Sequence, residues 1–306
     1  MRDIETIPLL TTVAGSYPTG GLPARRAMQR AIEDQIAAGV ELVSDGQVRG
    51  DIIGLFASRI PGFRQTGDGT WEIEDALDLP QSPTAVMDYA FARSLVAERA
   101  ELKGIVTGPI TLALSSRIAA SAPYSGPADP SLLLRLSEIL SHEVAALVAG
   151  GARVVQIDEP MLGAALGSRV SPELVYDALR KMAAIPRISV LHACGDVRQS
   201  APELLLLPFG VLHIENTRIA NLDAMDPDML AAATSRMSVG CVDTQTEDVE
   251  HVDVIFDRIS AAARMVESDR LWISPDCGLR RLPPEAAREK LRNMVLAARR
   301  ARIELL

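Results

Sequence analysis

The stretch Ile188-Ser189-Val190-Leu191-His192-Ala193-Cys194 carries the first indication of both fold and chemistry. Three of its first four residues, Ile188, Val190 and Leu191, are apolar and two of these are β-branched, a composition typical of a buried strand. Residues two apart on a strand point to the same side, so His192 and Cys194 project together where the run ends. A His-x-Cys pair alone is a weak signal, because such pairs also occur by chance.

Two later strand-like runs also end in residue types that bind metals. Val211–Ile214 is followed by Glu215, and Leu271–Ile273 is followed shortly by Cys277. With His192 and Cys194, these strand ends offer nitrogen, sulfur and oxygen ligands, a set that suits tetrahedral zinc. The alternative is that the thiols and the imidazole are ordinary buried side chains.

Short apolar runs alternate with amphipathic segments along the whole chain. Eight runs are predicted as strands: Leu10–Ala14, Glu41–Ser44, Gly104–Thr107, Arg153–Ile157, Arg187–Leu191, Val211–Ile214, Arg236–Cys241 and Leu271–Ile273. The clearest helical patterns between them are Ser131–Val148 and Pro284–Arg299. Eight β/α units in succession predict an α/β protein with a single (β/α)8 TIM barrel.

One segment departs from this alternation. Residues from Ile60 to Pro83 contain Pro61-Gly62, Gly67-Asp68-Gly69 and the strand-like Trp71-Glu72-Ile73-Glu74. This pattern predicts a hairpin-like insertion after the second strand. No repeat, low-complexity tract or linker divides the chain, so we expect residues 1–306 to form a single catalytic domain.

Composition narrows the class of protein. The chain has 306 residues, 48% of them hydrophobic, and a net charge of −9, which argues against nucleic acid or an anionic membrane as partner. The three cysteines are too few for a disulfide framework. No signal-peptide pattern or long apolar stretch occurs, so we expect a soluble, cytoplasmic protein.

On a (β/α)8 barrel the loops after the strands form the active face. The four candidate ligands all follow strands and therefore share one rim, which favours a zinc site made of His192, Cys194, Glu215 and Cys277. Zinc held this way can bind a substrate thiol and present it as a thiolate nucleophile. His213 faces the same way as Glu215 and is a rival ligand, although we expect it to lie behind the ligands.

Two further strand ends suggest how an amino acid would be held. Asp158 ends the fourth predicted strand, and a buried carboxylate there would suit an ammonium group; the alternative is a strand-end aspartate that caps the next turn. Gly15-Ser16, after the first strand, would offer a hydroxyl and backbone N–H groups to a carboxylate. The alternative for these two residues is a simple turn before Pro18.

Seven blocks of the sequence, in order, resemble the catalytic half of the cobalamin-independent methionine synthases, and still more their short, single-domain relatives. The blocks are Thr12–Pro18, Asp45–Asp51, Thr107–Thr111, Gln156–Pro160, His192–Cys194, Ile214–Arg218 and Pro275–Leu279. The resemblance implies a methyltransferase that forms methionine from homocysteine. It implies that the zinc ligands are His192, Cys194, Glu215 and Cys277. It also places the substrate amine at Asp158, as the catalytic residue, and the substrate carboxylate at Ser16 and Ala14.

The chain departs from the long, folate-using members of this family in ways that bear on the methyl donor. Gln47 stands where they have a glutamate that contacts the amine, and Gln245 stands where they have a proton-donating histidine. The aromatic residue that stacks on the pterin is missing from Ala113–Ser116. We therefore expect methylcobalamin or a methylated corrinoid protein as donor rather than a folate.

Two other functions fit the same residues. One is zinc-dependent alkyl transfer to a different thiol, such as one of the coenzyme M type. The other is a zinc-binding or corrinoid-binding barrel without catalytic activity.

Overall fold

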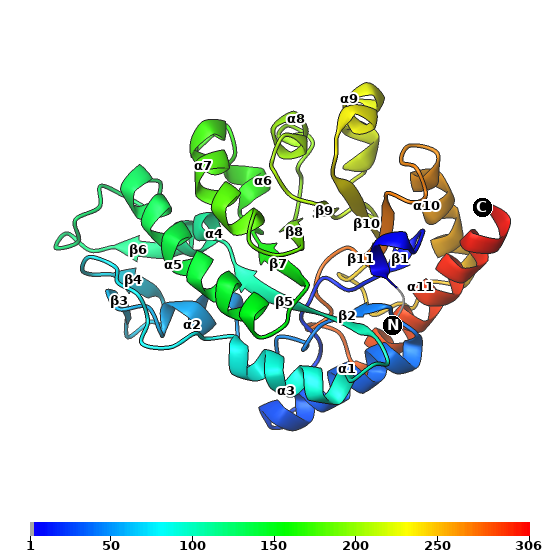
Figure 1. Ribbon diagram of the computed structural model, residues 1–306, viewed down its shortest axis with the longest axis horizontal. Helices are drawn as coiled ribbons and strands as arrows, with labels where there is room; N and C mark the ends of the chain where they lie inside the picture. The colour runs from blue at the N-terminus through cyan, green and yellow to red at the C-terminus, as the bar shows by residue number, and fades with distance from the viewer. Residues whose placement is uncertain (1–2) are drawn as a thin grey trace.

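Eight parallel strands form a sheet that curves until its two edges meet (Figure 1). The computed structural model describes residues 3–306. In order around the sheet the strands are β1 (Leu10–Thr11), β11 (Leu271–Pro275), β10 (Arg236–Val242), β9 (Val211–Ile214), β8 (Ile188–Ala193), β7 (Val154–Asp158), β5 (Glu101–Thr107) and β2 (Leu42–Val43). A parallel bridge between Thr12 and Leu42 joins the two edge strands and closes the barrel. The predicted (β/α)8 fold is confirmed.

The strand predictions differ from the structure mainly at their ends. β9 has the predicted bounds, whereas β5 begins at Glu101 rather than at Gly104. Glu101 and Lys103 concealed the start of β5 because charged residues seldom lie inside a barrel, yet they are only 8% and 2% exposed. β1 is shorter than predicted, since the chain keeps only the single bridge at Thr12 before it forms the loop that contains Ser16.

Helices surround the barrel. The longer ones are α1 (Ala24–Ala38), α3 (Val86–Val96), α5 (Pro130–Ala149), α7 (Pro172–Ala183), α10 (Val252–Ala263) and α11 (Pro284–Glu304). The shorter ones are η1 (Ile4–Thr6), α2 (Ile52–Ala57), α4 (Pro109–Leu114), α6 (Leu162–Ala165), α8 (Ala201–Leu205), η2 (Leu222–Ala224) and α9 (Pro227–Ala232). Both predicted helices are confirmed, and α11 runs five residues beyond its predicted end at Arg299. α5 begins where Asp129 accepts a hydrogen bond from the Ser131 backbone N–H (2.8 Å).

The inside of the barrel changes from apolar to polar along its axis. One end is filled by an apolar cluster: Ile4, Leu10, Leu42, Val154, Ile188, Val190, Val211 and Trp272. Above it lie buried polar side chains: Lys103, Gln156, His213, Ser238 and Ser274. A separate, larger apolar core fills the space between the sheet and the helices. The polar layer therefore lies beneath the carboxyl ends of the strands, where a TIM barrel carries its active site.

The insertion after the second barrel strand contains the predicted hairpin. β3 (Phe63–Gln65) and β4 (Trp71–Ile73) pair in antiparallel fashion, and α2 precedes them. A third strand, β6 (Ser116–Ile118), pairs in parallel with β4 and was not predicted. This small sheet lies at one end of the molecule's long axis and α11 lies at the other (Figure 1). Within residues 3–306, no helix is both long and apolar enough to cross a membrane.

Candidate active site

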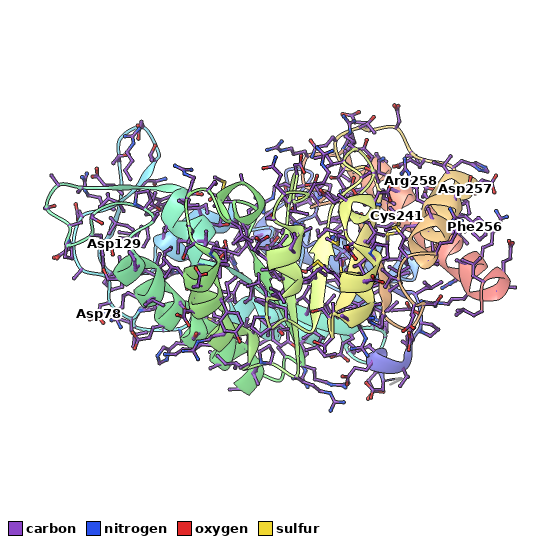
Figure 2. The ribbon with its side chains drawn as sticks, turned by 90° about the horizontal axis from the view of Figure 1, so that it is seen from above. Asp78, Asp129, Cys241, Phe256, Asp257 and Arg258 are labelled. Atoms are coloured by element: carbon purple, nitrogen blue, oxygen red, sulfur yellow. The ribbon has the colours of Figure 1, made fainter. Side chains whose placement is uncertain are left out.

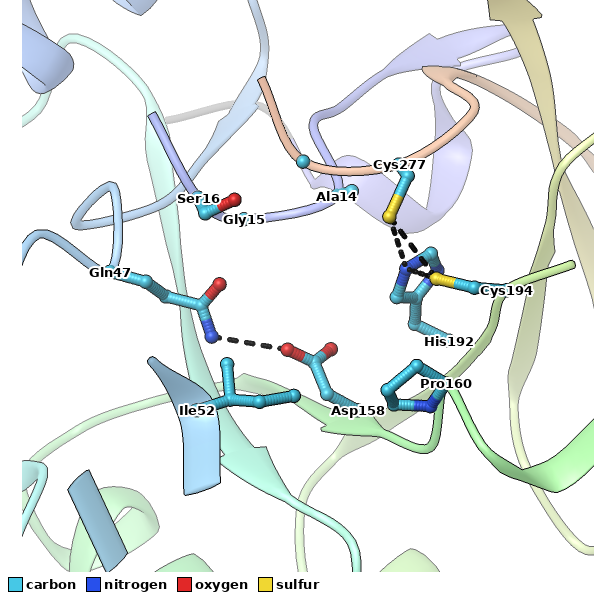
Figure 3. Close-up of a pocket in the computed structure, with 11 residues that line it drawn as sticks. Ala14, Gly15, Ser16, Gln47, Ile52, Asp158, Pro160, His192, Cys194 and Cys277 are labelled. Carbon is cyan, nitrogen blue, oxygen red and sulfur yellow. Dashed lines mark hydrogen bonds between the residues drawn. The ribbon is translucent and has the colours of Figure 1, made fainter. Parts of the chain in front are cut away.

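A small pocket opens at the carboxyl ends of the barrel strands, and most of the predicted site residues line it (Figure 3). Its lining residues are Ala14, Gly15, Ser16, Gln47, Ile52, Asp158, Pro160, His192, Cys194, Cys277 and Gly278. The cavity volume is about 120 Å³, well below the ~300–1,000 Å³ of drug-sized ligand sites. The pocket therefore suits a small molecule. One of its walls consists of two thiols and an imidazole, and a carboxylate faces this wall.

His192, Cys194 and Cys277 form a compact cluster on one wall of the pocket. The Cys194 sulfur lies 2.9 Å from His192 Nε2 and 3.1 Å from the Cys277 sulfur. The Cys277 sulfur lies 3.6 Å from the same imidazole nitrogen. His192 and Cys194 leave the end of β8 together, as their spacing of two predicted, and Cys277 follows β11.

The cluster favours ionisation of one of its two thiols. The hydrogen bond between the thiols lowers the pKa of Cys277 to about 4; burial opposes this and His192 adds to it. The same thiol–thiol hydrogen bond, followed by burial, raises the pKa of Cys194. Burial alone lowers the pKa of His192, but the Cys277 sulfur and the Asp158 carboxylate together raise it overall. The wall thus brings one nitrogen and two sulfur atoms together and favours the thiolate form of Cys277.

The spacing of these three residues fits a zinc ion. Tetrahedral bonds of about 2.3 Å to sulfur and 2.0–2.1 Å to nitrogen would set the sulfur atoms about 3.8 Å apart, and each sulfur about 3.6 Å from the nitrogen. The observed separations of 3.1, 2.9 and 3.6 Å lie within about 0.7 Å of these values. All three ligand atoms lie within 4.8 Å of one another. A small opening of the cluster would accommodate the ion.

Glu215, the predicted fourth ligand, does not join this group of three. It follows β9 and is partly buried; burial raises the pKa of its carboxyl, and the negative charge of Cys277 contributes to the increase. Its carboxylate is close enough to interact electrostatically with Cys277, but its role as a ligand stays a prediction. His213 lies behind His192, with ring centroids 4.3 Å apart, and its Nε2 is 2.9 Å from Ser274 Oγ. His213 therefore packs against His192 and is not part of the cluster.

Asp158 lies across the pocket from the sulfur atoms, at the end of β7. Its Oδ1 accepts a hydrogen bond from Gln156 Nε2 (2.6 Å), and its Oδ2 accepts one from Gln47 Nε2 (3.1 Å; Figure 3). Burial raises the pKa of Asp158, while His192 and the two amides act in the opposite direction. A buried carboxylate with two neutral amide donors and an open side toward the pocket is well suited to an ammonium group.

Gln47 reaches Asp158 from a strained backbone. Its φ is +45°, a left-handed conformation that costs an L-residue about 1–2 kcal/mol. Asp45 Oδ1 accepts its backbone N–H (2.9 Å), and Arg280 donates to its carbonyl. Strain held by specific partners at a pocket residue indicates that the position of the Gln47 amide matters there.

The loop after β1 forms the remaining side of the pocket. Ala14, Gly15 and Ser16 line it, and the carboxylate-binding role that the resemblance implies for Ala14 and Ser16 stays a prediction. A Cβ at residue 278 would lie 1.9 Å from Ser16 Oγ, so Gly278 leaves room for that hydroxyl. A Cβ at residue 15 would lie 2.7 Å from Gln47 Oε1. Gly15 is therefore needed for close packing against Gln47 rather than for a positive φ.

The third cysteine lies away from the pocket. Cys241 points from β10 into the outer apolar core, and its backbone carbonyl accepts a hydrogen bond from Arg258 of α10 (2.9 Å). Figure 2 shows Cys241 beside Arg258, Asp257 and Phe256, at the opposite end of the molecule from Asp78 and Asp129. Burial raises the pKa of the Cys241 thiol. It is a packed side chain of the outer core.

Gln245 and the segment Ala113–Ser116, which bear on the choice of methyl donor, lie outside the pocket lining. Gln245 is exposed and lies outside the described pocket lining. Ala113 and Leu114 end α4, and Ser115 and Ser116 follow them. None of the lining residues in the described chain is Phe, Tyr or Trp. Among the described residues, the His192 imidazole is thus the only aromatic ring in the pocket lining.

Sequence reasoning missed some residues that support the site. Arg280 donates a hydrogen bond to the carbonyl of Gln47, which lines the pocket, and Lys103 donates one to Gln156, the partner of Asp158. A lysine within the apolar run of β5 could have indicated a buried polar contact. Its partners could not be predicted because they lie far away in the sequence. Glu159 was also missed: its carboxylate accepts the backbone N–H groups of Ile110 and Thr111 at the start of α4 (3.0 and 2.7 Å).

The sequence matches the family model described as "Cobalamin-independent synthase, Catalytic domain" over residues 21–300. The chain belongs to the cobalamin-independent methionine synthase family. It is 36% identical to a protein of Methanothermobacter thermautotrophicus named methionine synthase, over 95% of this chain and 99% of that protein. It is 30% identical to the 5-methyltetrahydropteroyltriglutamate–homocysteine methyltransferase of Nitratidesulfovibrio vulgaris, over 99% of this chain but 42% of that longer protein.

Solved structures agree with this assignment at the level of the fold. A B12-independent methionine synthase from a Shewanella species, solved in complex with selenomethionine, superposes with a TM-score of 0.82 at 20% identity. The match covers 98% of this chain and 99% of that chain. As a member of the cobalamin-independent methionine synthase family, the chain is a methyltransferase.

Proposed function

We propose that the enzyme transfers a methyl group to the sulfur of homocysteine and so forms methionine. The observation that carries the proposal is that His192, Cys194 and Cys277 share one small pocket with Asp158. This arrangement pairs a sulfur-binding wall with an ammonium-binding carboxylate, which are the two ends of a short amino thiol. The names of the methionine synthase relatives agree with this substrate.

In this proposal His192, Cys194 and Cys277 hold zinc, and Glu215 is a fourth, exchangeable ligand. Bound zinc would lower the pKa of the substrate thiol and keep its sulfur anionic and nucleophilic. Asp158 holds the ammonium group of homocysteine, Gln47 orients Asp158, and Ser16 with the Ala14 loop receives the carboxylate. The thiol proton leaves to solvent. A carbon–sulfur bond then forms while the bond between donor and methyl breaks, with both electrons remaining on the donor.

For the donor we propose a methylated corrinoid, either free methylcobalamin or a corrinoid protein. Exposed Gln245 cannot protonate a pterin nitrogen, and no Phe, Tyr or Trp of the described chain lines the pocket. The relatives of this chain's length are named methionine synthase with no pterin in the name, whereas the pterin-named relative is more than twice as long. The family description "cobalamin-independent" argues against a corrinoid donor.

A donor comparison tests the proposal. The zinc-loaded protein is mixed with homocysteine and either methylcobalamin or methyltetrahydrofolate, and methionine is quantified. We expect faster turnover with methylcobalamin, by about 10²–10⁴-fold, because a folate lacks acid assistance here. Faster turnover with the folate would overturn the corrinoid donor but leave homocysteine methylation in place. No methionine from either donor, with coenzyme M also inert as acceptor, would favour a non-catalytic zinc-binding barrel.

A further inference from the structure

A lysine is buried inside the barrel directly beneath the pocket. Lys103 of β5 is 2% exposed, and it lies among polar side chains that face the barrel axis. Its Nζ donates to Gln156 Oε1 (2.5 Å) and to the carbonyl oxygen of Val13. Neither the zinc cluster nor the proposed methyl transfer uses this group, although burying an amine in a barrel is costly unless its charge or hydrogen bonds are compensated.

Gln156 connects this lysine to both sides of the amino-acid pocket. Its Nε2 donates to the Ala14 carbonyl (2.6 Å) and to Asp158 Oδ1 (2.6 Å). Because both of these partners offer oxygen, the amide nitrogen must face them and Oε1 must face the interior. A buried amide oxygen needs a donor there, and Lys103 is that donor.

The two acceptors of Lys103 suit it in either protonation state. Burial lowers the pKa of Lys103 to about 7, and Asp158 acts in the opposite direction. An ammonium and a neutral amine each have at least two N–H groups for Val13 and Gln156. The hydrogen-bonded chain from Lys103 therefore does not depend on complete ionisation.

We infer that Lys103 is a positioning residue of the amino-acid site: it holds Asp158 through Gln156 and the Ala14 loop through the Val13 carbonyl. It thereby sets the distance between the group that takes the substrate amine and the loop that takes the substrate carboxylate. The inference rests on the proposed function of this pocket in binding homocysteine. It assigns Lys103 no contact with substrate and no part in the chemical step.

Lys103→Met tests the inference, because Met has a similar length but cannot donate a hydrogen bond. We expect the Kd for methionine, measured by calorimetry, to rise about tenfold or more, as when a buried hydrogen bond to a charged network is lost. In the zinc-loaded enzyme the KM for homocysteine should rise while kcat changes little. Zinc content should stay at the wild-type value, since Lys103 contacts no residue of the zinc cluster.

A second buried lysine provides the matched control. Lys290 is fully buried, but it pairs with Glu250 (2.6 Å) beside α10, outside the pocket lining. Lys290→Met should lower stability without changing the Kd for methionine. An equal rise in Kd in both lysine variants would show a general loss of stability and overturn the inference.

Gln156→Leu keeps the test decisive if Lys103→Met does not fold. It should weaken methionine binding to a similar extent, because the same chain is broken at its next link. The double variant should be weaker than the worse single variant by less than the sum of the two effects, because Lys103 and Gln156 share the link to Asp158 while Lys103 alone holds the Val13 carbonyl. Unchanged methionine affinity in a folded Lys103→Met protein, or full additivity of the two effects, would overturn the inference. Asp158→Asn should lose homocysteine binding even if the Lys103 variant does not. That result would separate failure of this inference from failure of the proposed function.

Discussion

Cys194 and Cys277 each supply one sulfur to the proposed zinc site, whereas Cys241 supplies none. Cys194→Ala or Cys277→Ala should reduce bound zinc to well below one ion per chain, because two ligands hold zinc far less tightly than three or four. The barrel should stay folded, since both thiols lie above the apolar core. Elemental analysis of the purified variants, with circular dichroism as a check of folding, measures both. Cys241→Ala is the control and should keep its zinc; stoichiometric zinc in Cys277→Ala would refute the assignment.

Asp158 is the one carboxylate in the pocket lining, so it should account for most of the recognition of the substrate amine. Asp158→Asn preserves the shape but removes the charge, and it should weaken homocysteine binding by a few kcal/mol. Calorimetry with homocysteine measures the loss. 4-Mercaptobutanoate, which lacks the amine, is the control ligand and should bind the variant and the wild type about equally. Unchanged homocysteine affinity would remove Asp158 from the amine site.

At the scale of single elements, α4 depends on a contact that its own sequence does not contain. Gly108 precedes the helix and has no side chain to cap it; Glu159, which follows Asp158, accepts the first backbone N–H groups instead. A Cβ at residue 108 would lie 2.1 Å from the Glu159 carboxyl carbon. Gly108→Ala should therefore lower the free energy of unfolding by more than about 2 kcal/mol, through overpacking and loss of this cap.

Gly126→Ala is the matched control for that substitution. Nothing lies within 4 Å of a Cβ at residue 126, so this change should alter stability by no more than about 0.5 kcal/mol. Chemical denaturation of both variants gives the comparison. Similar stabilities for the two would mean that Glu159 moves aside at little cost and does not cap α4.

The elements differ in how far sequence alone predicts them. β8 and β9 were predicted well because each is a short, fully buried run, which can be recognised from neighbouring residues alone. β6 was missed because its three residues become a strand only by pairing with β4, which is distant in sequence. For the site, the predicted strand ends indicated which rim of the barrel carries the candidate ligands. They did not indicate in which direction each side chain points. His192 and Cys194 converge, whereas Glu215, at the next strand end, stays outside the group of three.

At the scale of the whole molecule, closure of the barrel is what converts separate strand ends into one pocket. Residues from β1, β2, β7, β8 and β11 or the loops that follow them meet at one rim, although they span residues 14 to 278. That the chain forms one domain over residues 1–306 stays a prediction. A single cooperative unfolding transition, seen alike by fluorescence and circular dichroism, would support it.

The buried Lys103 also makes the stability of the whole molecule depend on pH. Burial lowers its pKa from the ordinary 10.5 to about 7 in the folded protein. Between these values the unfolded chain keeps the lysine proton and the folded chain does not, so the unfolded state binds more protons. The contribution of Lys103 to the free energy of unfolding therefore increases as the pH rises through that interval. Below the folded pKa this increase is absent.

Lys103→Met isolates this contribution, since the other titrating groups are present in both proteins. The free energy of unfolding of the wild type, minus that of the variant, should increase as the pH is raised from about 7 toward 10. Denaturation by urea at a series of pH values, with equal zinc loading, provides the measurement. A constant difference across this range would show that the folded protein keeps Lys103 charged. In that case Asp158 and the surrounding amides compensate the buried ammonium more strongly than burial opposes it.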